Sequence, residues 1–144
     1  MPLHVLLIED NHADVMLVRQ ALRGQGLDFT IHEMSDAEEA LAYIDRMGET
    51  EEAPCPDVVL LDLNVPKGQG TELLDALRKS PKCPEVPVIL ISSSASPQDR
   101  AKAQQTGATR YFQKPIVLDE FLKLGALVAE VLEEQNLKRD RTET

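Results

Sequence analysis

Three short runs of apolar residues lie along the chain, and each run stops abruptly at polar side chains. The runs occupy residues 3–8, 58–61 and 86–91. They are followed, in order, by Glu9 and Asp10, by Asp62, and by Ser92, Ser93 and Ser94. Continuous apolar runs of this length are typical of strands buried on both faces of a parallel sheet. Residues 29–33 and 109–113 fit two further, weaker strands.

Between the predicted strands, apolar residues recur at the three- and four-residue spacing of amphipathic helices. This spacing occurs in residues 15–22, 37–44, 73–77 and 121–132. A further helix should have Ser96 as its cap and Pro97 in its first turn, and should stop at Gly107. Gly125 falls within the last helix, where glycine costs about 1 kcal/mol relative to alanine.

The alternation of strand and helix predicts an α/β fold. One parallel sheet would be covered on both faces by helices, giving a three-layer α/β/α sandwich with right-handed crossovers. The length of 144 residues suits a single domain. We expect that domain to span residues 1–134, with an acidic surface loop at residues 48–56. Residues 135–144 are polar and are expected to form a frayed tail, with no output domain.

Charge and composition narrow the class of partner. The formal net charge is −10, from 25 acidic and 15 basic residues, and it repels nucleic-acid phosphates and anionic lipid surfaces. No apolar stretch reaches the roughly 18 residues that a membrane span needs. The N-terminal residues lack the features of an export signal. We therefore expect a soluble, cytoplasmic protein that binds neither nucleic acid nor membrane.

The two cysteines, Cys55 and Cys83, are too few and too unpatterned for a disulfide framework or a zinc site. Each precedes a predicted strand, and the two strands should be neighbours. The sulfurs could therefore approach each other on the edge of the sheet opposite the strand-end acids. We expect both to be free thiols. The histidines, at positions 4, 12 and 32, lack metal-ligand spacing, and solvated or sheet-edge positions are expected for them.

The polar residues at the strand ends predict a single site. Ligands of open α/β sheets bind beyond the carboxyl ends of the strands, where Glu9, Asp10 and Asp62 should converge. Each acid alone is more simply interpreted as a helix cap or a solvated loop residue. Together they repel one another unless a cation compensates, and hard oxygen ligands favour Mg²⁺. Ser92 and Lys114, after two further strands, add a hydroxyl group and a positive charge.

Four segments carry a resemblance to a known family. LLIEDN, LLDLNVPKGQG, VILISSSAS and RYFQKP occur in this order, and residues 3–132 resemble the receiver domains of two-component response regulators. The resemblance implies a flavodoxin-like, five-stranded sheet with strand order 2-1-3-4-5. It also implies a bacterial phosphorelay protein that carries a 4-aspartylphosphate and is not an enzyme acting on other substrates.

The resemblance assigns roles to the site residues. Asp62 would accept a phosphoryl group from the phosphohistidine of a sensor histidine kinase or phosphotransfer protein. Mg²⁺ would be held by Glu9, Asp10, Asp62 and the backbone carbonyl of Asn64, and would neutralise charge on the phosphoryl oxygens. Lys114 would pair with Asp62 at rest and with a phosphoryl oxygen afterwards.

Two further positions match the switch residues of the family. Ser92 would be the hydroxyl that reaches the phosphoryl group, and Tyr111 the aromatic ring that moves with it. Without the resemblance, Ser92 would be a cap or loop serine and Tyr111 a half-buried strand residue. Lys114–Pro115 matches a cis peptide bond of the family. Gly70 matches the turn after the acceptor strand.

The expected output is a contact with another protein. A downstream partner, or a second copy in a homodimer, would use the surface formed by the predicted helix at 97–106, the strand at 109–113 and the last helix. Three features are similar to phytochrome-associated single-domain regulators: the long loop at 48–56, the NHADV helix start and the KGQG sequence after the acceptor. Glu9 stands where aspartate is more usual, which is a conservative departure.

Three other interpretations remain open at this point. A pseudo-receiver would share the fold without being phosphorylated, although Asp62, Ser92 and Lys114 are all present. A flavodoxin-like cofactor carrier would need a glycine- and hydroxyl-rich phosphate loop where this chain has EDNHAD. An aspartate-nucleophile phosphatase would usually have a second acid at the position of Asn64.

Overall fold

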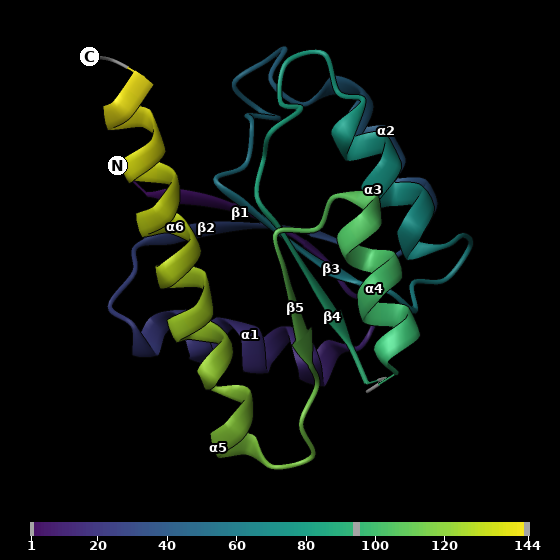
Figure 1. The fold of residues 1–144 in the computed structure, drawn as a ribbon, viewed down its shortest axis with the longest axis vertical. Coiled ribbons are helices and arrows are strands. Elements are labelled where there is room, and N and C mark those ends of the chain that lie inside the picture. The colour runs from purple at the N-terminus through teal and green to yellow at the C-terminus, as the bar shows by residue number, and fades with distance from the viewer. Residues whose placement is uncertain (1, 94–95, 143–144) are drawn as a thin grey trace.

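A computed structural model describes residues 2–93 and 96–142 and shows a five-stranded parallel sheet with helices on both faces (Figure 1). The strand order is β2-β1-β3-β4-β5, so the predicted fold class and strand order are confirmed. The strands are β1 (Leu3–Ile8), β2 (Phe29–Met34), β3 (Val58–Asp62), β4 (Val88–Ser92) and β5 (Arg110–Gln113). Ser94 of the predicted serine run and the last two residues of the predicted tail lie outside the described residues.

The helices divide between the two faces of the sheet (Figure 1). One face is covered by α1 (His12–Gly24), α5 (Leu118–Phe121) and α6 (Lys123–Thr142), and the other by α2 (Ala37–Arg46), α3 (Gly70–Arg78) and α4 (Pro97–Thr106). Each face has its own buried core. Along β1, Val5 and Leu7 belong to the first core, whereas Leu6 and Ile8 belong to the second. None of these described helices has the length and apolar character needed to cross a bilayer.

The continuous apolar runs are explained by the place of their strands in the sheet. Every residue of β3 and of β4 is buried, because both strands lie inside the sheet and are covered on both faces. The edge strands β2 and β5 are largely only half-buried. Their sequence patterns are weaker because an edge strand has a neighbour on one side alone.

Helices α1 and α6 approach each other closely, and Gly125 permits this approach. A methyl group on Gly125 would lie 2.2 Å from the carbonyl oxygen of Ala21 in α1. Leu124 and Val128 of α6 are fully buried in the same core as Ala21. The glycine that weakens an isolated helix is therefore required by the packing of this one.

The C-terminal segment differs from its prediction in two ways. The predicted helix at 121–132 is two elements, because the short α5 ends at its cap Leu122 and α6 begins at the next residue. α6 then continues to Thr142, so the prediction of a frayed tail is wrong for residues 135–142. The polar composition suggested an irregular tail. However, glutamine, leucine, lysine and arginine are good helix formers, and extending an existing helix costs little.

Helix α4 buries little of its own surface and is held by Arg78 at its C-terminal end. It has a single buried residue, Ala103, whereas α1, α2 and α3 each have four. It starts at the predicted cap Ser96 and ends at Gly107, which lies in the left-handed region (φ 103°). At that end the guanidinium group of Arg78 donates two hydrogen bonds to the carbonyl oxygen of Gly107, at 3.0 and 2.7 Å, and one to that of Val86 at 2.6 Å.

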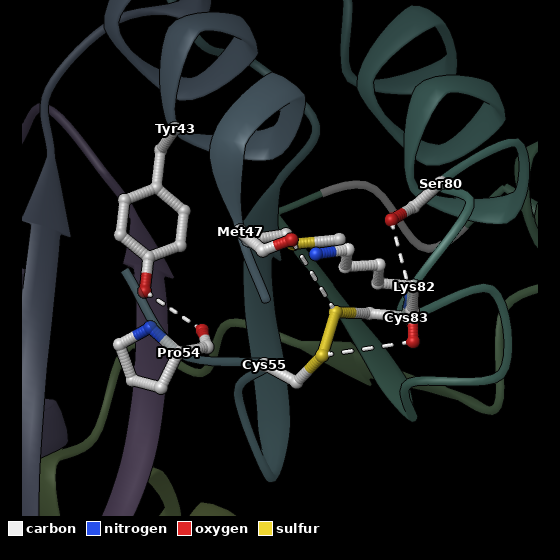
Figure 2. Close-up of a disulfide and its surroundings, with 7 residues drawn as sticks. All are labelled: Tyr43, Met47, Pro54, Cys55, Ser80, Lys82 and Cys83. Carbon is white, nitrogen blue, oxygen red and sulfur yellow. Dashed lines mark hydrogen bonds between the residues drawn. A yellow bond between two sulfur atoms is a disulfide. The ribbon is translucent and has the colours of Figure 1, made fainter. Parts of the chain in front are cut away.

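The two cysteines are joined, so the prediction of free thiols is wrong. Cys55 and Cys83 form a disulfide with a Cα–Cα distance of 5.8 Å, which is within the range that the bond requires. Figure 2 shows that the bond links the loop before β3 to the loop before β4. The expected approach of the two residues at the edge opposite the acids is confirmed. Two unpatterned cysteines gave no reason to expect a bond there.

The histidines occupy two parts of the fold. His12 is exposed at the start of α1, while His4 of β1 and His32 of the edge strand β2 are half-buried. Nδ1 of His4 lies 3.1 Å from Nε2 of His32, and the ring of His32 also packs against Tyr43 with 5.6 Å between centroids. Burial and the neighbouring His4 lower the pKa of His32. The predicted solvated or sheet-edge positions are confirmed for His12 and His32, and the prediction is wrong for His4, because β1 lies between β2 and β3.

Candidate functional site

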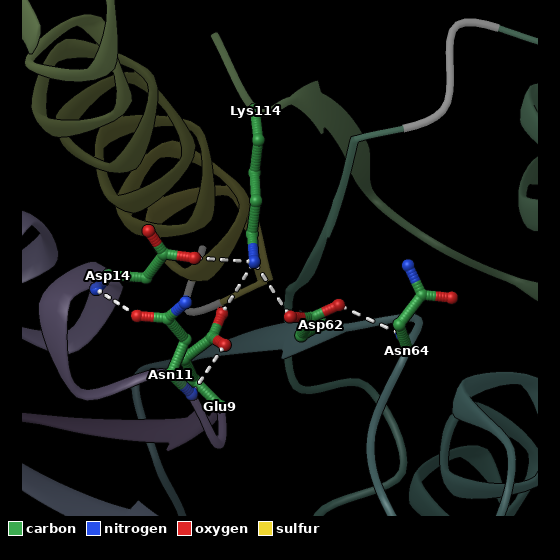
Figure 3. A network of polar contacts seen from close by, with 6 residues as sticks. All are labelled: Glu9, Asn11, Asp14, Asp62, Asn64 and Lys114. Carbon is green, nitrogen blue, oxygen red and sulfur yellow. Dashed lines mark hydrogen bonds and ion pairs between the residues drawn. The ribbon is translucent and has the colours of Figure 1, made fainter. Parts of the chain in front are cut away.

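Side chains from the carboxyl ends of three strands meet at one point. Glu9 directly follows β1, Asp62 is the last residue of β3, and Lys114 directly follows β5. The Nζ atom of Lys114 lies 2.9 Å from Glu9 Oε2 and 2.8 Å from Asp62 Oδ2, as Figure 3 shows. Both carboxylates are buried, at 5% and 4% exposure. The convergence predicted from the strand ends is confirmed.

Three acids at this point are close enough to share a metal ion. Glu9, Asp10 and Asp62 each offer one carboxylate oxygen, and these atoms all lie within 4.8 Å of one another. Asp10 is exposed, so the cluster opens to solvent on its side. Carboxylate oxygens are the ligands that Mg²⁺ prefers, and an open side leaves room for the waters that Mg²⁺ retains. The residues present therefore fit the predicted metal.

The electrostatics of the site reflect the crowding of like charges. Burial, followed by the nearby Asp62, raises the pKa of Glu9 to about 7. Burial alone would lower the pKa of Lys114, but its hydrogen bonds to Asp14, Asp62 and Glu9 outweigh burial and raise that pKa. At neutral pH the lysine is therefore charged, and Glu9 is poised between its two protonation states. A second cation in the site would favour the ionised form of Glu9.

Backbone groups of the adjacent loops orient two of the carboxylates. The N–H of Asn11 donates to Glu9 Oε1 at 3.0 Å, and the N–H of Asn64 donates to Asp62 Oδ1 at 2.8 Å. Asp62 therefore has one oxygen held by the backbone and the other held by Lys114 (Figure 3). The carbonyl oxygen of Asn64, predicted as a metal ligand, belongs to the same loop. Its role as a ligand stays a prediction.

Asp14 is a member of the site that sequence reasoning missed. Its Oδ2 lies 2.8 Å from Nζ of Lys114, so the lysine contacts three carboxylates. Asn11 caps α1 by accepting a hydrogen bond from the backbone N–H of Asp14 at 3.1 Å, and this cap aims the first turn of the helix at the site. The available signal was the spacing of Asp14 four residues after Asp10, in the first turn of a helix that starts at the strand end.

Ser92 and Gly70 border a hollow beside Asp62. The hollow, of about 280 Å³, lies between the loop after β3 and α4, and Asn64 and Lys102 also line it. Ser92 is 2% exposed, and its carbonyl oxygen accepts a 2.7 Å hydrogen bond from the backbone N–H of Lys114. This bond fixes the end of β4 to the end of β5. A methyl group on Gly70 would lie 2.8 Å from the Cα atom of Leu63, so the predicted turn glycine is required by close approach.

Tyr111 lies farther along the same face. The residue is half-buried in β5, and the guanidinium group of Arg100 from α4 stands 5.3 Å from the centre of its ring. The ring therefore connects β5 to the first half of α4. Its role as a switch stays a prediction.

One predicted feature of the site is wrong. The peptide bond between Lys114 and Pro115 is trans, as are all peptide bonds among the described residues. The cis form was expected from the family resemblance alone. The trans isomer is the one that X–Pro bonds generally prefer.

The fold and the site together define a class of protein: a doubly wound signalling domain with a lysine-bridged acidic cluster at the carboxyl edge of its sheet. The chain belongs to the response regulator receiver domain family, whose model matches residues 5–125. Receiver domains of this family act in two-component systems. The resemblance found in the sequence motifs is confirmed.

Individual relatives agree with this assignment. The chain is 31% identical to the response regulator Rcp1 of Synechocystis sp. over 123 residues, which cover 85% of this chain and 84% of Rcp1. It is 33% identical to FilR2, a probable methanogenesis regulatory protein of Methanothrix harundinacea, over 83% of this chain and 76% of FilR2.

Solved structures give the same result. The phosphorylated cyanobacterial phytochrome response regulator RcpA matches with a TM-score of 0.82 at 29% identity, over 94% of this chain and 96% of RcpA. The Mn²⁺-bound form of Rcp1 matches with a TM-score of 0.76 at 31% identity, over 86% of this chain and 89% of Rcp1. The predicted similarity to phytochrome-associated regulators is confirmed by these matches.

Proposed function

We propose that this chain is a phosphoacceptor: Asp62 receives a phosphoryl group from a phosphohistidine of a sensor histidine kinase or phosphotransfer protein. A carboxylate oxygen of Asp62 forms the new bond to phosphorus, while the P–N bond breaks and the imidazole nitrogen keeps the electron pair. The observation that carries the proposal is the contact set of Asp62. One oxygen is 2.8 Å from the ammonium group of Lys114, and the other is held by the backbone at 2.8 Å.

Mg²⁺ is the proposed cofactor, held by Glu9, Asp10, Asp62 and the backbone carbonyl of Asn64. When bound, it neutralises charge on the phosphoryl oxygens during transfer. The grouping of three carboxylate oxygens within 4.8 Å supports this ligand set, and the Mn²⁺-bound structure of the relative Rcp1 supports a divalent cation.

Lys114 supplies the second positive charge in the proposed mechanism. At rest it pairs with Asp62, and after transfer its ammonium group is free to pair with a phosphoryl oxygen. Asp14 and Glu9 hold the lysine side chain at the site while this exchange takes place. The lysine therefore needs no large movement between the two states.

The phosphodonor is proposed to contact apolar residues beside the site. Ile116, Val117 and Leu118 follow Lys114 almost directly and are all exposed, with Ile116 fully so. A run of exposed large apolar side chains next to a reactive group suits a protein partner. The similarity to RcpA makes a phytochrome-type histidine kinase the first donor to test.

The output is proposed to pass through a downstream protein or a second copy of the chain. Ser92 would follow the phosphoryl group, and Tyr111 would respond to the movement of Ser92. The backbone bond from Lys114 to Ser92 and the contact of Arg100 with Tyr111 connect the acceptor site to α4 and β5, which form the proposed output surface together with the last helix, α6. Repulsion by the net charge of −10 supports a partner that is neither nucleic acid nor an anionic membrane.

Phosphorylation with a small donor tests the proposal. The wild type, Asp62→Asn and Asp75→Asn are incubated with acetyl phosphate and Mg²⁺, and intact masses are measured. Asp75 is a matched control because it is an exposed aspartate of α3 that pairs with Lys79 away from the site. The wild type and Asp75→Asn should gain one phosphoryl group, whereas Asp62→Asn should gain none, and EDTA should prevent the gain. An unmodified wild type under donor excess would instead identify a pseudo-receiver. Equal labelling of Asp62→Asn would place the acceptor elsewhere.

A further inference from the structure

The disulfide lies at the end of the sheet opposite the acidic site, and its two sulfurs differ in access. Cys55 is exposed, whereas Cys83 is 6% exposed. The Cys83 sulfur lies 3.8 Å from the carbonyl oxygen of Met47, beneath the end of α2 (Figure 2). An incoming thiol therefore reaches the Cys55 side of the bond more easily.

A hollow lies directly beside the bond. It has a volume of about 360 Å³, which is within the range of small-molecule sites, and both cysteines line it. Lys82 and Lys138 contribute positive charge to its walls, and Asp57 and Glu85 contribute negative charge. The thiolate is the form of cysteine that reacts.

We propose that Cys55 and Cys83 form a reversible redox pair and that Cys55 is the residue modified by low-molecular-weight thiols. Disulfides are rare in reducing compartments, and those found there are usually transient or redox-sensing. Receiver domains act in two-component systems, and we expect this one in the reducing cytoplasm. In that compartment, a disulfide with one exposed sulfur fits a regulated bond better than a permanent one. The proposal is independent of phosphorylation at Asp62.

The chemistry is thiol–disulfide exchange in two balanced steps. An external thiolate attacks the sulfur of Cys55, forms a mixed disulfide with it, and releases the Cys83 thiolate, which takes a proton from water. A second external thiolate then attacks the external sulfur and releases the Cys55 thiolate. Two external thiols thus become one external disulfide as the protein bond becomes two thiols. A low-molecular-weight disulfide drives the reverse reaction.

Contacts other than the disulfide keep the two cysteines near each other after reduction. The backbone N–H of Gly48 donates to the carbonyl oxygen of Ala53 at 2.7 Å, and Ala53 is 1% exposed. The hydroxyl group of Tyr43 donates to the carbonyl oxygen of Pro54 at 3.1 Å. The loop before β3 is therefore held on the protein from Gly48 to Pro54, directly before Cys55. This favours return to the internal disulfide over loss of the pair.

Glutathione tests the proposal on the folded protein. Air-oxidised wild type is incubated with reduced glutathione, quenched with an alkylating agent, and analysed by peptide mapping without reduction. The map should first show the Cys55–Cys83 cross-link, and then glutathione on Cys55 with alkylated Cys83. Absence of the cross-link before treatment would overturn the proposal. So would a bond that opens only after urea unfolds the protein, or an adduct found mainly on Cys83.

Single variants give a matched comparison of the two sulfurs. Cys83→Ser leaves Cys55 alone, and Cys55→Ser leaves Cys83 alone. With oxidised glutathione, Cys83→Ser should form its adduct at a rate roughly tenfold higher than Cys55→Ser, because reaction rates follow access. Circular dichroism checks that both variants are folded. Equal rates in two folded variants would overturn the assignment of Cys55, and if either variant is unfolded, the wild-type map decides.

Discussion

At the carboxyl ends of the strands, one ammonium group holds three carboxylates together, whereas at the amino ends a covalent bond joins two loops. The first arrangement depends on protonation and on cations, because Glu9 is buried among other acids and its pKa is raised to about 7. The second depends on external thiols and disulfides, which exchange with its sulfurs.

This difference shows how one small sheet can keep two kinds of chemistry at opposite ends. The central strands β3 and β4 run between the two ends and are wholly buried, so they keep the ends apart as a rigid core. Crowded like charges cost stability, and they are tolerated where the proposed chemistry needs them. The opposite end carries the cross-link. A change at one end should therefore leave the property of the other end intact.

The largest expected effect is loss of the disulfide. Replacing both cysteines with serine removes a cross-link between residues separated by 28 positions, which should lower the free energy of unfolding by roughly 3 to 4 kcal/mol. Urea unfolding measures this loss. The rate at which acetyl phosphate labels Asp62 should stay unchanged at a temperature where both proteins are folded. A labelling rate that falls several-fold would show that the two ends are coupled and would break the comparison.

The next effect concerns the cation of the acidic end. Lys114→Met leaves Glu9 and Asp62 buried without their ammonium partner, which should cost about 1 to 3 kcal/mol in EDTA after Glu9 takes up a proton. Saturating Mg²⁺ should restore much of this loss, since a divalent cation replaces the missing charge. Asp14→Asn is the control, because it keeps the shape of the side chain and leaves Lys114 paired with Glu9 and Asp62. If Mg²⁺ does not reduce the loss of stability in Lys114→Met, the stability of the acidic site does not depend on a cation, and the comparison fails.

A substitution at Gly48 tests how tightly the disulfide packs against the loop before β3. Gly48 has φ 84°, and a methyl group there would lie 3.0 Å from the Cys55 sulfur, 3.0 Å from Cβ of Lys82 and 3.1 Å from the Cys83 sulfur. Gly26 has a similar φ of 69° with nothing within 4 Å. Gly26→Ala therefore measures the backbone cost alone, about 1 kcal/mol, and Gly48→Ala should cost more in urea unfolding. Equal losses of stability in the two variants would show that the neighbouring atoms move aside to accommodate the added methyl group.

The smallest effect is the pH dependence of His32, and its sign is opposite to that of Glu9. The pKa of His32 is lowered below 6.5 in the folded state, so the unfolded state binds more protons and stability falls as the pH drops below 6.5. The pKa of Glu9 is raised from 4.5 to about 7, so without metal its contribution to stability grows as the pH falls through 7. In EDTA, His32→Gln should therefore gain more stability than the wild type on acidification. If stability measured by urea unfolding depends on pH identically in the wild type and in His32→Gln, His32 does not contribute to this pH dependence.

The buried strands and the acidic cluster were predictable from the sequence because their signals are local and strong. A strand covered on both faces is apolar throughout, and the first polar residue after it marks the edge of the sheet where ligands bind. Glu9, Asp10, Asp62 and Lys114 were all found in this way. Boundaries such as the start of β4, at Val88 and not at residue 86, were less accurate because an apolar residue before a strand can be buried without pairing.

The missed features depend on distant parts of the chain. Asp14 joins the site because α1 is capped by Asn11 and directed toward Lys114, which is 100 residues away. The disulfide depends on two loops whose separation was unknown, and the cis bond before Pro115 was expected from the family resemblance alone. Gly125 looked unfavourable until the approach of Ala21 was known. Such contacts leave no periodic trace in a single sequence.

The asymmetric attachment of α4 determines how that helix can move. The carbonyl of its C-terminal cap, Gly107, is held by Arg78, while the helix buries a single residue of its own. If Ser92 follows the phosphoryl group as proposed, we expect α4 to rotate about its Gly107 end, with the largest displacement at its first turn and the smallest at its last. The Arg100–Tyr111 contact lies in the first half of the helix and is the one stretched by such a rotation. A partner that senses this rotation would therefore bind near residue 97, because the position of the helix would change little near residue 107.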